Sequence, residues 1–150
     1  MGSNKSIKQI QLIYFAIVVM LAFFAGFAFY FVSSVGKVSG FDFGMETNLK
    51  SLNILLALVG IPASYMFHKR KVSHIDPDLP YERKIMQYRT AFFIKMTTLE
   101  GLSLISILIY LTTGEINQLI VFGLLYLFIL LNYPSVKAID KDLENNNNDQ

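Results

Sequence analysis

Residues 10–32 read IQLIYFAIVVMLAFFAGFAFYFV, and none of them is charged. A helix needs about 20 such residues to cross the roughly 30 Å hydrocarbon core of a bilayer. A helix of a soluble bundle would show polar residues about every 3.6 residues along one face, and this run has no such polar face. The run is also too long for the apolar part of a signal peptide, which has about 7–15 residues. Residues 10–32 therefore predict an uncleaved transmembrane helix.

Three further apolar runs predict three more helices. Residues 51–67 and 116–136 carry no Asp, Glu, Lys or Arg, and the third helix, expected over residues 80–111, contains Lys95 and Glu100 in its apolar part. The expected fold is all-α: an integral membrane four-helix bundle forming a single transmembrane domain over residues 1–144. Residues 145–150, NNNNDQ, have nothing to bury and are predicted to be a disordered tail.

The composition of the whole chain agrees with a membrane protein. Of the 150 residues, 53% are apolar and only 16% are charged, with a mean hydropathy of +0.45. Soluble domains carry about 25% charged residues and leave much of their surface in water. The absence of cysteine excludes disulfides, thiolate zinc sites, cysteine nucleophiles and cysteine-bound iron–sulfur clusters. A formal charge of +2 does not support nucleic-acid binding.

The positions of the basic residues predict the orientation. Ten Lys and Arg residues lie in the two terminal segments and the loop between helices two and three, against two on the opposite side. The ten are Lys5, Lys8, Lys69, Arg70, Lys71, Arg83, Lys84, Arg89, Lys137 and Lys141, and the two are Lys37 and Lys50. Because cytoplasmic loops are enriched in Lys and Arg, both termini are expected in the cytoplasm, with the protein in the inner membrane as a multi-pass chain.

Glu100 is the main candidate functional residue, because it falls halfway along the third apolar run. An ionised carboxylate at that depth costs at least about 2.5 kcal/mol. Tyr126 and Glu100 are at similar distances in sequence from the turn after Thr113, so they are expected at the same depth. We therefore predict that Glu100 faces the interior of the bundle and contacts Tyr126. We also predict that Glu100 is largely protonated, because burial disfavours its charged form. Thr97 and Ser103 complete this candidate intramembrane polar site. Lys95, five residues before Glu100, points elsewhere and is expected to extend to the headgroups.

Other motifs suggest structure rather than chemistry. Gly60 and Pro62 predict a kink or local unwinding of the second helix, because proline lacks an amide donor. His68, His74, Asp76 and Asp78 match no metal-site geometry, so no metal site is expected. The sequence contains no glycine-rich phosphate loop, zinc-protease helix, nucleophile elbow or EF-hand. We therefore expect no enzymatic activity and no cofactor.

Two resemblances bear on these expectations. The segments beginning YRTA at Tyr88, LEG at Leu99, LTTG at Leu111 and NYP at Asn132 resemble small uncharacterised four-helix bacterial membrane proteins, which brings no known activity. Helices two and three are also distantly similar to the hairpin of rotary ATPase proteolipid c subunits. That similarity implies an ion-carrying role for Glu100. The chain lacks the repeated glycines of that family and its Arg-Gln-Pro loop, and Pro62 has no counterpart there.

Two functions follow from these observations. The first is a small non-enzymatic membrane protein, an accessory or interaction subunit whose partners are membrane lipids and either another membrane protein or a second copy of the chain. The alternative is a proton- or cation-translocating module that uses Glu100. Translocation requires polar residues along a route from Glu100 to the surface, and Thr97 and Ser103 alone are too few to form one.

Overall fold

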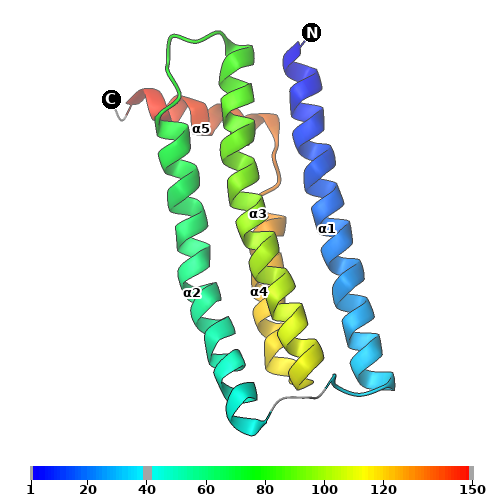
Figure 1. The fold of residues 1–150 in the computed structure, drawn as a ribbon. Coiled ribbons are helices and arrows are strands. Elements are labelled where there is room, and N and C mark those ends of the chain that lie inside the picture. The colour runs from blue at the N-terminus through cyan, green and yellow to red at the C-terminus, as the bar shows by residue number, and fades with distance from the viewer. Residues whose placement is uncertain (1, 39–41, 149–150) are drawn as a thin grey trace.

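The computed structural model describes residues 2–38 and 42–148, and this part of the chain is helical without strands (Figure 1). Its helices are α1 (Gly2–Ser34), α2 (Phe43–Ser73), α3 (Tyr81–Thr113), α4 (Ile116–Leu131) and α5 (Val136–Asn148). The all-α prediction is confirmed. The helices α1, α2 and α3 are each long and apolar enough to cross a membrane, and α4 qualifies as a fourth span only when it is joined to α5.

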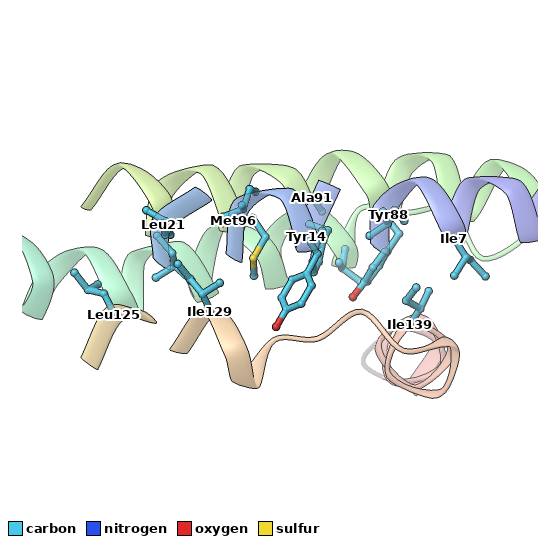
Figure 2. Packing of buried hydrophobic residues seen from close by; sticks show 14 of the residues in the cluster. Ile7, Tyr14, Leu21, Tyr88, Ala91, Met96, Leu125, Ile129 and Ile139 are labelled. Carbon is cyan, nitrogen blue, oxygen red and sulfur yellow. The ribbon is translucent and has the colours of Figure 1, made fainter. Parts of the chain in front are cut away.

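The helix α3 is the centre of the packing. It lies between α1 and α2 in Figure 1 and packs against both of them and against α4. Buried apolar side chains of α1, α3 and α4 form a continuous row that also includes Ile139 of α5 (Figure 2). By contrast, large apolar side chains on the outer faces of α1 and α2 are exposed, among them Phe23 at 74% and Leu58 at 72%. Such an apolar exterior is typical of a protein surrounded by lipid.

The fourth helix differs from its prediction. We expected a helix over residues 116–136, but α4 ends at Leu131 and the chain turns by 82° into α5. Pro134 explains the break, because proline lacks the amide hydrogen that a continuing helix requires. The 16 residues of α4 span about 24 Å. Residues 132–135 form the non-helical connection from α4 to α5.

The helix α5 is a fifth element that the four-helix prediction lacks. It includes residues 145–148, so most of the segment expected to be disordered continues a helix in the structure, while residues 149–150 lie outside the described part. Ile139 and Leu143 of α5 are buried. Because α5 carries the charged residues Lys137, Asp140, Lys141, Asp142 and Glu144, it is unsuited to hydrocarbon. It lies across the end of the molecule where α1 begins (Figure 1).

Candidate functional site

The structure does not bring the predicted intramembrane site together. Glu100 is half-buried and, among the described residues, takes part in no hydrogen bond or ion pair. The hydroxyl of Tyr126 instead donates to the carbonyl oxygen of Val18 on α1, at 3.2 Å. The predicted contact failed because equal depth does not determine which way a residue faces around its helix axis. Ser103 is buried and donates to Leu99 of its own helix at 2.8 Å, whereas Thr97 is exposed.

Gly60 and Pro62 lie within an unbroken helix. The helix α2 runs from Phe43 to Ser73 through Pro62, so the chain is not unwound there. Gly60 has a different role, since α2 approaches α3 closely at this point. A Cβ atom added at Gly60 would lie 2.4 Å from Cδ1 of Leu102, well inside van der Waals contact. The glycine therefore permits close helix packing.

A second polar cluster, which the sequence did not predict, surrounds a cavity beneath α5. The cavity has a volume of about 240 Å³ and lies between α2, α3, the α4–α5 connection and α5 itself. We call it the α5 cavity. Its polar lining residues are Tyr65, His68, Tyr88, Lys95, Asn132, Tyr133 and Asp142. Apolar side chains, including Phe92 and Leu131, form the rest of the wall.

Lys95 is the cationic group of the α5 cavity. It is only 5% exposed, so its side chain is enclosed by the protein instead of extending outward as we expected. Its Nζ donates to Oδ1 of Asn132 at 2.8 Å and lies 5.2 Å from the ring centre of Tyr65 and 5.7 Å from that of Phe92. Asn132 in turn donates through Nδ2 to the hydroxyl of Tyr65 and to the carbonyl oxygen of Phe128. The break at the end of α4 therefore supplies the acceptor that keeps Lys95 inside.

The acidic side of the cavity joins α5 to α2 and α3. Oδ2 of Asp142 accepts hydrogen bonds from Nε2 of His68 at 3.4 Å and from the hydroxyl of Tyr88 at 3.0 Å. Burial acts to raise the pKa of Asp142, but the hydrogen bonds from His68 and Tyr88, together with the electrostatic effect of His68 and Lys95, hold this pKa below its ordinary value. Asp142 is thus a carboxylate at neutral pH. His68 is 7% exposed, and its Nδ1 is buried without a hydrogen-bond partner.

A separate buried network links α2, α3 and α4 near their other ends. The hydroxyl of Ser106 donates to Oδ1 of Asn53 at 2.9 Å, and Nδ2 of Asn53 donates to Oε1 of Gln118 at 2.6 Å. All three residues are at most 1% exposed. These neutral side chains satisfy one another, which is characteristic of polar contacts that hold membrane helices together.

The α5 cavity was missed because its residues come from four separate segments of the chain. The only local signals were a lysine within an apolar run and Pro134 near the end of another. Neither signal shows that α5 folds back on His68 and Tyr88. Within residues 2–38 and 42–148, no group of three or more His, Asp or Glu side chains is placed to hold a metal ion.

Comparison with known proteins identifies no relative. No family model, no curated protein and no solved structure matches the chain.

Proposed function

We propose that the chain is a multi-pass protein of the inner membrane in which α1 to α4 cross the bilayer and both termini are cytoplasmic. The exposed apolar faces of α1 and α2 support the membrane location. The excess of Lys and Arg in the terminal segments and in the α2–α3 loop supports the orientation. In this arrangement α5 lies along the cytoplasmic surface and the α5 cavity lies near the headgroups.

Labelling of single cysteines tests this orientation, because the chain has no cysteine of its own. A cysteine replacing Asn48, which is exposed near the start of α2, should react with a membrane-impermeant thiol reagent in intact cells. A cysteine replacing Asp76 in the α2–α3 loop should react only after the cells are opened. Labelling of position 76 in intact cells would overturn the orientation.

We further propose a non-enzymatic role: the protein is an accessory subunit that pairs within the membrane with another protein through Glu100. The observation that carries this proposal is the half-buried carboxyl group of Glu100, which has no partner among the described residues. A polar group facing hydrocarbon without a partner costs free energy. A transmembrane helix of another protein with a basic or hydrogen-bond-donating side chain at the same depth would remove that cost.

Site-specific photocrosslinking in intact membranes tests the pairing. We expect a photoreactive residue at Thr97, one turn before Glu100 and exposed, to give one discrete adduct with a transmembrane protein. The adduct should fall at least tenfold when Glu100 is replaced by leucine, because the apolar side chain cannot pair. The same probe at Leu58, on the exposed face of α2, is the matched control and should give no discrete adduct.

Two results would contradict the pairing with another protein. An adduct of twice the chain mass would assign the Glu100 surface to a second copy of the chain. No adduct, together with an infrared carboxylate band at neutral pH that vanishes in Glu100→Gln, would favour the cation-translocating alternative. In that case Glu100 would be charged and hydrated rather than paired.

A further inference from the structure

The α5 cavity contains a positive charge that the protein does not neutralise by direct contact. Among the described residues the ion pairs join Lys37 to Glu46, Lys50 to Glu115 and His68 to Asp142, so Lys95 belongs to none of them. Its ammonium has three donors, and Asn132 accepts from one. A buried charge is stable only when it is paired and its hydrogen bonds are satisfied. The two remaining donors therefore call for an acceptor in the cavity.

Asp142 is close enough for its charge to act on Lys95, but it forms no ion pair with Lys95. Its Oδ2 atom instead accepts from the hydroxyl of Tyr88 and from Nε2 of His68. Nδ1 of His68, on the same lining, is also buried without a hydrogen-bond partner. The two free donors of Lys95 therefore favour an occupant with acceptor oxygens.

We propose that the α5 cavity binds a phosphate group through Lys95, either from the headgroup of an acidic phospholipid or from a soluble phosphate. Lysine binds phosphate as a point charge, and basic pockets between membrane helices on the cytoplasmic side are known to receive acidic headgroups. The amide of Asn132 and the hydroxyl of Tyr65 lie next to Lys95 and can reorient toward the ligand. Leu131 and Phe92 offer an apolar wall for the glycerol part of a lipid.

Native mass spectrometry of the full chain, released from nanodiscs of phosphatidylcholine with phosphatidylglycerol, tests the lipid source. We expect the wild-type protein to retain phosphatidylglycerol in preference to phosphatidylcholine. Retention should fall at least tenfold in Lys95→Met and persist in Lys95→Arg, which keeps the charge. Lys69→Met is the matched control, since Lys69 is an exposed lysine directly after His68, and it should retain the lipid as the wild type does.

A thermal unfolding series in detergent tests the soluble source. Inorganic phosphate should raise the unfolding temperature of the wild type relative to chloride at equal ionic strength, because a ligand that binds only the folded state stabilises it. The rise should be lost in Lys95→Met and kept in Lys69→Met. Binding in either experiment with this dependence on Lys95 supports the proposal and identifies the source.

Should neither phosphatidylglycerol nor inorganic phosphate distinguish the wild type from Lys95→Met, the proposal is wrong and the cavity holds only water. Should Lys95→Met fail to fold, Lys95→Gln provides the second variant. It keeps a hydrogen-bonding side chain and removes the charge, so it should also lose the preference for phosphatidylglycerol and the stabilisation by phosphate. Equal binding by Lys95→Gln and the wild type would also overturn the proposal.

Discussion

Replacing Asn53 with leucine should lower the free energy of unfolding by about 1–2 kcal/mol. Asn53 is the middle member of the buried network and bonds to both Ser106 and Gln118. The hydroxyl of Ser106 keeps a second acceptor, the carbonyl oxygen of Leu102 at 3.1 Å. Gln118, which is 1% exposed, would lose the bond to its amide oxygen and have no water to replace it. The unsatisfied amide oxygen of Gln118 should therefore account for most of the lost stability.

Unfolding in mixed detergent micelles measures this effect. Asn48→Leu makes the same substitution at an exposed position of α2 and should change stability little. The double variant Asn53→Leu, Gln118→Leu should recover part of the loss, because replacing both partners removes the unsatisfied group. If Asn53→Leu were as stable as the wild type, the network would contribute nothing to the packing of α2 against α4.

Replacing Gly60 with alanine should destabilise the protein by about 1–3 kcal/mol, the usual range for overpacking. The new methyl group would lie 2.4 Å from Cδ1 and 3.3 Å from Cγ of Leu102, so this side chain or the whole of α2 must move. The expected result opposes the intrinsic preference, because alanine favours a helix over glycine by about 1 kcal/mol. A destabilised Gly60→Ala variant would thus show that the packing against Leu102 outweighs the helix propensity of alanine, and a stabilised variant would show the reverse.

Two companion variants make the result specific. Gly26→Ala on α1 has no atom within 4 Å of the added Cβ, so it should be neutral or stabilising. Leu102→Ala combined with Gly60→Ala should be more stable than the sum of the two single changes predicts, because each accommodates the other. Additive losses would show that α2 and α3 are not in close contact at this point.

The sequence predicted the apolar helices well and the polar contacts poorly, for physical reasons. Long uncharged runs such as residues 10–32 determine a spanning helix by themselves, because hydrocarbon tolerates no other backbone arrangement except a closed barrel. The contacts of Glu100, Tyr126 and Lys95 depend instead on rotation about each helix axis and on the path of the chain after Leu131. The depth of a residue along its helix can be counted from the nearest turn. The direction in which its side chain faces depends on how the helices pack. Asn132 and Asp142 acquire their roles only through the break that Pro134 imposes.

Because α5 is the last helix of the chain and forms part of the α5 cavity, the cavity can be completed only late in synthesis. The cavity walls from α2 and α3 emerge from the ribosome early, but Asp142 follows only after α4 has been made. Lys95 is therefore made before Asn132, which accepts its hydrogen bond. The α5 cavity is complete only after the last helix of the chain has been made.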